Sequence, residues 1–554
     1  MENVSRDLQE GHRNFSCSLL SHYVFFFSDE KRRSAQPSNI SAVSFLLFTS
    51  ATKYSKLIKE QSHPPLRTRT MKIGIIPHQK DDFIVKEGSE RPEFPEFQPT
   101  HDGYSKPHDT PLNKRNFVYT PCAPIKEFTQ LGYCNTEYPY SRTGFNTMDR
   151  SDGLSMKNGV NDTVGVVDTM GWRSGRSDVC IKDGISYWEI EVVKGGSTPQ
   201  PNGEDDVLKG KEAIDQSPHL RFGVSRREAS LEAPVGFDSY SYGIRDQALE
   251  SVHEGRLVKQ LNNSGVSLKP GDRVGLLLTL PTREEQINQA KEYATRRLEA
   301  LELADNNSSN VDSLTGRSDS TNSNGMPARK RPKVWKPSPK GFERALLQEI
   351  DYNDIVRDQI AIRYKGQLFF ESSDYVKTTK PEYYSSDRRE RQDYYTLGGS
   401  SLKLFLNGEY IGISFEDLSP FLPPFSEVQY NEKFYYNHWK NGETMPGVLG
   451  TEDGKTNSQY ANDITQTAHT LLRNKYVNNN RLGYYPTVSC FNGGEGRLIT
   501  TKDELKYLEQ TEAQLQGGKA KTLDQLFAEQ VSDDLVWDLI DEIEEEIGAG
   551  KQNV

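Results

Sequence analysis

The histidines, serines and glycines that could do catalytic chemistry are scattered along this chain and form no recognisable catalytic set. None of the ten histidines lies in an H-E-x-x-H pair, and the sequence holds neither a G-x-S-x-G nucleophile turn nor a Walker phosphate loop. The glycine-rich run at 493–496 follows a predicted strand, but no helix pattern begins there, so it predicts a tight turn rather than a phosphate site. We therefore expect a protein that is not an enzyme.

Two short segments carry residues suited to binding nucleic acid or an import receptor. Residues 383–395 interleave tyrosines with arginines, a composition typical of single-stranded nucleic-acid surfaces. Their three interleaved carboxylates favour a solvated charged loop instead. A basic cluster elsewhere matches a nuclear import signal, with a basic linker as the alternative. Its residues are Lys330, Arg331 and Lys333.

The C-terminal segment combines an apolar face with an acidic one. Over residues 523–547 apolar side chains recur every four positions, which places them on one face of a helix, and no Lys or Arg lies between Lys521 and Lys551. The helix either packs back on its own domain or offers its apolar face to a groove on another protein. Our hypothesis is a partner-docking helix, so deletion of residues 522–554 should leave the sandwich folded. Its proposed contact residues are Leu535, Val536, Trp537, Leu539, Ile540 and Ile543.

Composition and cysteine spacing limit the class of protein. The chain has 554 residues, of which only 34% are hydrophobic, and a net charge of −11, so we expect one large core with polar insertions and no general affinity for nucleic acid. Five scattered cysteines include no C-x-x-C pair and no zinc spacing, which favours reduced thiols without a metal or other cofactor. The apolar runs at 23–27 and 43–48 are too short to cross a bilayer, so no membrane partner is expected.

Short alternating strands dominate the chain from residue 154 onward. In residues 187–193 apolar and acidic side chains alternate, which predicts a half-buried antiparallel strand. Residues 365–366 and the Asn-Gly pair at 407–408 are predicted to be hairpin turns. Residues 484–491 are predicted to be the last strand, with Pro486 marking an edge or a bulge. The pattern predicts a mainly β protein, an antiparallel β-sandwich with polar insertions.

Composition divides the chain into four segments, of which the third is interrupted by polar insertions. These insertions hold too few apolar residues to offset the entropy of ordering them, although the second begins with a predicted helix at 284–303. The segments are residues 1–70, whose place in the mature protein is open; 71–153, an extension packing on the sandwich; 154–500, the sandwich, with insertions at 196–217, 283–345 and 440–473; and 501–554, the C-terminal region.

Several stretches of the predicted sandwich resemble a SPRY domain. They are residues 171–192 at its opening, 219–245 in its middle, and 404–412 and 483–491 in its closing strands. The stretch LEAPVGFDSY at 231–240 further resembles the Ash-type subunit of COMPASS, the complex that methylates the fourth lysine of histone H3, and within that family the budding-yeast form. The segment DLVWDLID at 534–541 resembles the family's motif for docking on the small Dpy-30-type dimer.

The resemblance covers about residues 71–548 outside the insertions and implies a non-catalytic scaffold in the nucleus. It implies that the SPRY domain binds an acidic peptide of the β-propeller subunit and that the C-terminal helix binds the helical dimer. Both contacts would support the SET-domain catalytic subunit, with the nucleosome contacted indirectly. The family's peptide-binding arginines match Arg173 and Arg221, and Arg176 is close enough to assist. Pairing of these arginines with the chain's own carboxylates is the alternative.

The chain also departs from that family, and a rival class remains open. Animal members carry a zinc-binding and winged-helix module, but no Cys/His cluster exists here, and residues 1–70 have no counterpart that we recognise. The rival hypothesis is a SPRY substrate receptor of a ubiquitin ligase. Such receptors usually carry a RING or a cullin-adaptor box, whereas the cysteines here form no RING cluster and the acidic terminal helix fits an adaptor box poorly. A single-stranded nucleic-acid binder, based on residues 383–395, comes third.

Overall fold

The computed structural model describes the two main sheets, one long helix and the first part of the C-terminal helix. The described residues are 97–101, 103–107, 117–121, 143–157, 160–196, 217–261, 268–312, 359–364, 367–373, 376–377, 395–422, 425–426, 428–429, 480–515, 518–534 and 536. Predictions that fall outside them concern residues 1–70, the import cluster Lys330, Arg331 and Lys333, the run at 383–394, and the helix residues Leu535, Trp537, Leu539, Ile540 and Ile543.

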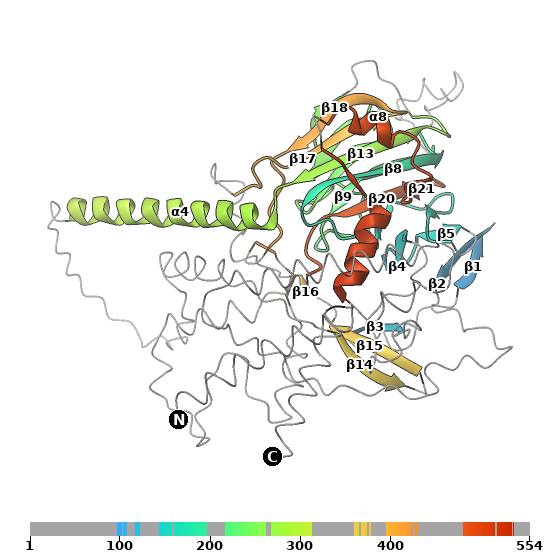
Figure 1. The fold of residues 1–554 in the computed structure, drawn as a ribbon, viewed down its shortest axis with the longest axis horizontal. Helices are drawn as coiled ribbons and strands as arrows, with labels where there is room; N and C mark the ends of the chain where they lie inside the picture. The colour runs from blue at the N-terminus through green and yellow to red at the C-terminus, as the bar shows by residue number, and fades with distance from the viewer. Residues whose placement is uncertain are drawn as a thin grey trace, which may run out of the picture.

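The larger sheet has ten strands, all paired antiparallel except β22, which lies parallel to β8 (Figure 1). In spatial order they are β1 (Phe97–His101), β2 (Tyr104–Pro107), β5 (Ser155–Lys157), β6 (Thr163–Gly165), β21 (Glu495–Ile499), β8 (Gly184–Lys194), β13 (Arg273–Leu280), β17 (Ser401–Leu406) and β18 (Glu409–Glu416), with β22 (Lys521–Thr522) beside β8. β8 pairs with β13, β21 and β22, so strands from the middle and from the C-terminal end of the described chain meet there.

The second sheet has seven antiparallel strands and carries the residues that the resemblance singled out. In spatial order they are β12 (Arg256–Gln260), β11 (Glu250–His253), β10 (Ser241–Arg245), β9 (His219–Ser225), β20 (Tyr485–Phe491), β7 (Arg173–Ser177) and β4 (Phe145–Arg150). The remaining elements are a sheet of β14 (Gln359–Tyr364), β15 (Gln367–Ser373) and β3 (Phe117–Pro121), the pair β16 (Val376–Lys377) and β19 (Val428–Gln429), and the helices α4 (Arg283–Asp312) and α8 (Leu508–Glu512).

The hydrophobic core fills the space between the two main sheets, which confirms the predicted mainly β, antiparallel sandwich. Alternate positions of the central strands face it: Trp188, Ile190 and Val192 from β8, and Leu220, Phe222 and Val224 from β9, all without exposed surface. Burial of each such side chain contributes about 1.5–3 kcal/mol to folding. The alternation in β8 that predicted its core face is therefore confirmed.

The acidic side of β8 is covered as well, so the prediction of a half-buried strand is wrong there. Tyr187 and Glu189 have no exposed surface. Tyr187 packs in a second, smaller cluster with Leu508 and Ala520, which belong to the C-terminal region. A strand pattern cannot reveal this cover, because it comes from residues more than 300 positions further along the chain.

The hairpin turn predicted at 407–408 is confirmed. Asn407 and Gly408 have φ values of 49° and 86° and connect β17 to β18, with Leu406 opposite Glu409. Asparagine and glycine tolerate this left-handed backbone, which most residues avoid. Tyr364 of β14 lies opposite Gln367 of β15, so these strands form an antiparallel pair, whereas the predicted turn residues 365–366 lie outside the described residues. The glycine run at 493–496 begins with the tight turn that connects β20 to β21, as predicted.

Two expectations about residues 484–491 are wrong. This strand, β20, lies in the centre of the second sheet between β9 and β7, and β21 and β22 follow it in sequence. Pro486 is tolerated in this central position because it lies just before Thr487, the first residue of β20 that pairs with β7. On the other side of the strand it lies opposite Val224 of β9. A missing backbone N–H at the start of the ladder with β7 removes no bond from it.

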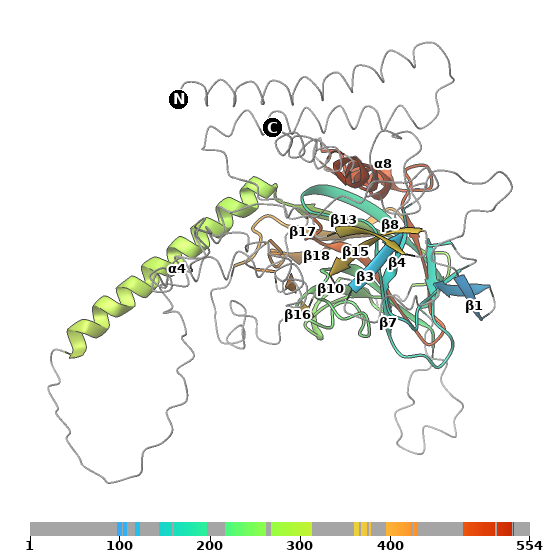
Figure 2. The same cartoon turned by 90° about the horizontal axis from the view of Figure 1, so that it is seen from below.

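The helix predicted at 284–303 at the start of the second insertion is confirmed but continues to Asp312. It starts with a capping box, in which the Thr282 N–H donates to the Glu285 carboxylate at 2.8 Å and the Glu285 N–H donates to Thr282 Oγ1 at 3.3 Å. The Thr282 hydroxyl also donates to the Glu285 carboxylate at 2.8 Å, and the two bonds that this carboxylate accepts from Thr282 hold the pKa of Glu285 below its ordinary value. Tyr293 and Ala294 are buried in the core, and beyond them α4 projects away from the sandwich (Figures 1 and 2).

Candidate docking surfaces

The outer face of the second sheet carries Arg221. Because side chains alternate along β9, Arg221 points away from the core that Leu220 and Phe222 enter. Its cross-strand partners are Arg245 on β10 and Ser489 on β20. Side chains directly opposite each other in a ladder share a face, so the two arginines lie together on the outside of the sandwich.

Arg221 has hydrogen-bonding capacity that the described residues do not use. Its side chain is half-buried, and its Nε is shielded from solvent without a hydrogen-bond partner. Its guanidinium lies over the Trp172 ring, 4.9 Å from the ring centre, a cation–π contact. Burial, and secondarily the charge of Arg245, lowers the pKa of Arg221 to about 10, so it remains a cation at neutral pH. A bound carboxylate would accept hydrogen bonds from the unused N–H groups of Arg221 and offset both the cost of its burial and the repulsion from Arg245.

Arg245, which the sequence did not single out, lies beside Arg221, and an exposed aromatic residue belongs to a loop over the same face. Arg245 forms an ion pair with Glu250 at 2.7 Å, and its own side chain is 40% exposed. Phe237 is 58% exposed, the largest exposed fraction of any aromatic in the described chain. Its loop lies over the same face, because the Val235 N–H donates to Ser489 Oγ at 2.9 Å. Only the register between β9 and β10 could have revealed Arg245 as a neighbour of Arg221.

The structure does not place Arg173 beside Arg221 on one face. Arg173 is the first residue of β7 and lies opposite Cys490, whose side chain enters the core. Its Nε is 3.3 Å from the Glu232 carboxylate, and its Nη1 donates to the Trp172 carbonyl at 2.8 Å. The alternative in which an arginine pairs with the chain's own carboxylate therefore describes Arg173 in this structure. Its exposed partner, Glu232, could still exchange with another carboxylate.

Arg176 is occupied within the fold. Its Nε and Nη2 each donate to the Asp149 carboxylate at 2.7 Å, and its Nη1 donates to the carbonyls of Arg226 and Ala229. Its side chain is only 5% exposed. The bidentate pair also holds the pKa of Asp149 below its ordinary value, despite the opposing effect of burial. Arg176 thus fastens β4 and the loop after β9 to β7, and it has little capacity left for a ligand.

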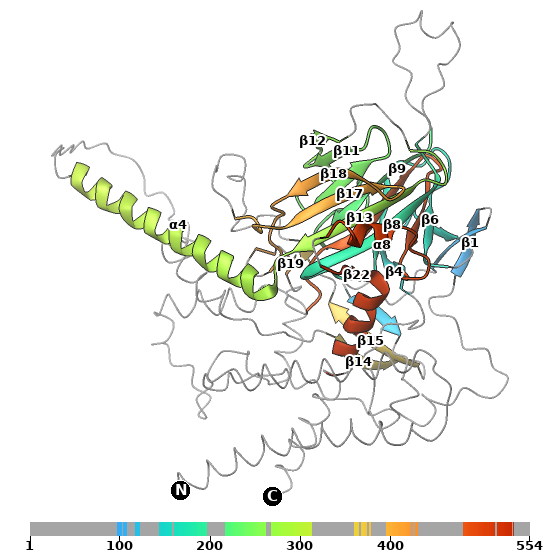
Figure 3. The same cartoon turned by 45° about the horizontal axis from the view of Figure 1, so that its top comes forward.

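The C-terminal helix packs on its own domain over the part that the structure describes. Residues 523–534 are helical, and the helix lies against the sandwich (Figure 3). Leu523 and Phe527 are buried in the main core, and Val536 is 4% exposed. Burial of Leu523 and Phe527 alone contributes about 3–6 kcal/mol. Deletion of residues 522–554 would therefore remove part of the core, so the separable segment begins only after Val536.

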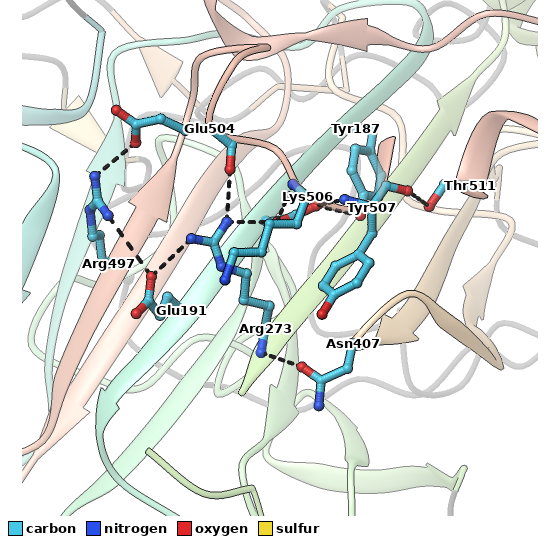
Figure 4. Close-up of polar contacts among 10 residues, drawn as sticks. Tyr187, Glu191, Arg273, Asn407, Arg497, Glu504, Lys506, Tyr507 and Thr511 are labelled. Atoms are coloured by element: carbon cyan, nitrogen blue, oxygen red, sulfur yellow. Dashed lines mark hydrogen bonds and ion pairs between the residues drawn. The ribbon is translucent and has the colours of Figure 1, made fainter. Parts of the chain in front are cut away.

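A buried charge network fastens the C-terminal region to the larger sheet (Figure 4). Glu189 accepts hydrogen bonds from the Tyr507 N–H at 2.8 Å and the Lys506 N–H at 3.3 Å. Arg273 lies 3.1 Å from Glu189 and 3.2 Å from Glu191. Buried charges are tolerated only when they are paired and hydrogen-bonded, as they are here. The network thereby sets where the chain enters the C-terminal helix.

One set of residues has the order of a hydrolytic triad but holds the fold. Ser217 Oγ lies 2.9 Å from His219 Nε2, and His219 Nδ1 lies 3.3 Å from Asp246 Oδ2. The same carboxylate oxygen accepts the N–H groups of Gly196 and Leu220 at 2.8 Å each. Asp246 therefore anchors the start of β9, and we assign the set a structural role. The described residues contain no group of acidic, histidine or cysteine side chains suited to a metal, and no helix among them could cross a membrane.

These features define a β-sandwich protein with a basic and aromatic outer surface and a C-terminal helix rooted in its core. No family model matches the chain. The COMPASS component BRE2 of Saccharomyces cerevisiae is 49% identical over 512 residues, which cover 86% of this chain and 99% of that protein. The Set1 complex component ash2 of Schizosaccharomyces pombe is 25% identical over 89% of this chain and 56% of its own length. The chain belongs to this family of COMPASS components.

Solved structures add a weaker comparison. The SPRY domain of human HERC1 covers 65% of this chain and 99% of its own, with 9% identity and a TM-score of 0.24. A second human SPRY domain gives 10% identity and a TM-score of 0.21. Scores this low add nothing to the sheet topology, on which the fold assignment rests.

Proposed function

We propose that this chain is a non-catalytic scaffold subunit of a COMPASS-type complex that methylates the fourth lysine of histone H3. In this role it binds an acidic peptide of the β-propeller subunit through the outer face of its second sheet. It binds a Dpy-30-type dimer through the C-terminal helix, and both contacts support the SET-domain subunit. The six curated relatives, all named as components of COMPASS or of the Set1 complex, favour this function over a ubiquitin-ligase receptor.

The observation that carries the peptide site is the unused guanidinium of Arg221. A half-buried arginine with an unpartnered Nε, stacked on Trp172 and next to Arg245, suits a carboxylate ligand. The planar guanidinium can grip a carboxylate through two hydrogen bonds, which a lysine cannot do. Phe237 offers an apolar contact to a neighbouring residue of the same peptide. Arg173 does not lie beside Arg221 and is paired with Glu232, so it would contribute only after release from Glu232.

Calorimetry with the purified β-propeller subunit tests the peptide site. Replacement of Arg221 by glutamate should weaken binding by several kcal/mol, because the acidic peptide would face a like charge. Arg173→Glu should weaken it less, since Arg173 is already neutralised. Arg296→Glu, an exposed position on α4, is the matched control and should bind normally. Native affinity of a folded Arg221→Glu protein would contradict the proposed site.

The dimer site is proposed on the apolar stripe Leu535, Trp537, Leu539, Ile540 and Ile543. Val536 is left out because it is only 4% exposed within this chain. Deletion of residues 537–554 should abolish binding of the dimer while leaving the sandwich folded, because Leu523, Phe527 and Val536 are kept. Trp537→Ala alone should cost about 2 kcal/mol or more, since large aromatic side chains dominate such grooves. Unchanged dimer affinity of Trp537→Ala in calorimetry would contradict this part of the proposal.

The scaffold is proposed to act in the nucleus, where it contacts the nucleosome only through its partners. Lys330, Arg331 and Lys333 are the proposed import signal. Their replacement by alanine should reduce nuclear accumulation of the tagged chain in cells that lack the other subunits, so that no partner carries it in. Full nuclear accumulation of this variant would contradict the import role.

A further inference from the structure

The last described turns of the C-terminal helix are fastened to the sandwich by polar contacts as well as apolar ones. The side-chain amide of Gln530, itself 7% exposed, bridges one loop of the sandwich. Its Oε1 accepts the Cys180 N–H at 3.2 Å, and its Nε2 donates to the Asp178 carbonyl at 3.0 Å. The amide therefore satisfies two backbone groups of the loop and fixes the rotation of the helix against it.

Two ion pairs continue this attachment one turn further along the helix. Arg481 lies 2.5 Å from the Asp534 carboxylate, and Lys182 lies 4.0 Å from that of Asp533. The side chains of Arg481, Asp533 and Asp534 are 14–22% exposed, so solvent screens these pairs less than it screens surface pairs. The acidic residues that the sequence placed on a free polar face are thus engaged with the sandwich in the described part of the helix.

The two loops that receive these contacts form a single cradle, residues 178–182 and 480–484. Ile181 and Tyr484 exchange two backbone hydrogen bonds of 2.8 and 3.0 Å, which join the loops. The second loop continues directly into β20, which pairs with β9 and lies opposite Arg221. The cradle and the arginine surface are therefore parts of one hydrogen-bonded sheet.

We propose that this clamp, formed by Gln530, Asp533 and Asp534 on the cradle, is a positioning device for the docking helix. It fixes the direction in which the helix leaves the sandwich and so holds the bound dimer at a set place relative to Arg221. The inference rests on the proposed function of the helix. Apolar burial of Leu523 and Phe527 keeps the helix attached but is not directional, whereas hydrogen bonds and ion pairs at two successive turns define an orientation. An α-helix then carries that orientation forward as a rod.

Pulsed electron paramagnetic resonance on the full chain tests the clamp. One spin label is placed at Ser230, an exposed loop residue, and the other at Glu545, on the acidic side of the helix predicted over residues 523–547, with Cys17, Cys122 and Cys134 replaced by serine. The wild-type chain should give one narrow distance distribution, both free and with the dimer bound. Gln530→Ala and Arg481→Asp should each broaden it markedly. Exchange of the charges in Arg481→Asp with Asp534→Arg should narrow it again.

The control and the functional readouts separate positioning from stability. Glu529, on the same helix as the clamp residues, forms an exposed ion pair with Lys521 of β22; Glu529→Ala breaks it and should leave the distribution narrow. In the clamp variants dimer affinity should stay within about twofold, because the stripe is untouched. Methylation by the reconstituted complex should fall by about fivefold or more, a typical size for coupling between sites. Melting curves verify that each variant is folded.

The possible failures are distinguishable. A narrow distribution in folded Gln530→Ala and Arg481→Asp proteins would overturn the clamp. Failure of the charge exchange to restore the narrow distribution would also count against it. Loss of dimer binding only in the clamp variants would assign these residues to the dimer interface and overturn the positioning role. If the wild-type chain binds no dimer, the proposed docking function fails, whereas the measurement on the free chain still decides whether the clamp exists.

Discussion

Glu189 is the residue whose removal most directly tests how the C-terminal region is attached. In Glu189→Ala the N–H groups of Lys506 and Tyr507 lose their acceptor, at a cost of about 1–3 kcal/mol for each that stays buried and unpaired. Arg273 also loses one carboxylate, but it keeps Glu191 at 3.2 Å and the Glu504 carbonyl at 2.8 Å. The Arg273 guanidinium therefore still has a charged partner in Glu189→Ala.

The expected loss of unfolding free energy is about 3 kcal/mol, the low end for breaking a buried charge pair. Urea denaturation of the whole chain measures it, and hydrogen exchange should show that protection is lost first in residues 504–515. Glu191→Ala is the matched control on the same strand. Its side chain is 29% exposed, so it should cost less than about 1 kcal/mol. Equal stability of the Glu189→Ala and Glu191→Ala proteins would refute the reasoning.

Three further predictions concern thiols, pH and packing. Burial raises the thiol pKa of Cys180 and Cys490. In a chain whose other cysteines are replaced by serine, a thiol reagent should therefore label neither residue before the protein unfolds. Rapid labelling of the folded protein would contradict this prediction. Burial lowers the pKa of Arg221 to about 10, so its positive charge persists below that pH and is lost above it. The affinity for the acidic peptide should therefore be constant from roughly pH 6 to 9 and fall at higher pH. A decline in affinity between pH 7 and 8 would speak against the role of Arg221. In Gly223→Ala the new Cβ would lie 2.0 Å from the Tyr242 carbonyl oxygen, which should lower the free energy of unfolding by about 1–3 kcal/mol. In the control Gly171→Ala the new Cβ meets no atom within 4 Å. Equal melting temperatures of the two variants would contradict this packing.

Local patterns predicted the elements of this fold because those elements depend on local chemistry. Alternation identified β8, and an Asn-Gly pair identified the turn between β17 and β18. The position of Pro486 could not be predicted, since the place of β20 between two strands that lie far away in sequence depends on the whole sheet. The same holds for Glu189, whose cover comes from residues 504–508.

For the candidate sites too, the sequence identified individual residues but not the residues that lie next to them in space. The resemblance identified Arg221, but Arg245 and Phe237 join it only through strand register and the course of one loop. Arg173 and Arg176 are separated from Arg221 by their own internal partners, which no spacing in the sequence reveals. The apolar period of the C-terminal helix predicted a buried face but could not say which protein buries it. Over residues 523–534 the apolar face of the helix is buried by the sandwich of this same chain.

The measurement that tests the scaffold function most directly is histone methylation by the reconstituted complex with and without this chain. The chain alone should transfer no methyl group, and the complex that lacks it should be slow. Addition of the wild-type chain should restore the rate, as should the Arg296→Glu control, whereas Arg221→Glu should restore little of it. Methyl transfer by the chain alone, or full restoration by a folded Arg221→Glu protein, would contradict the account.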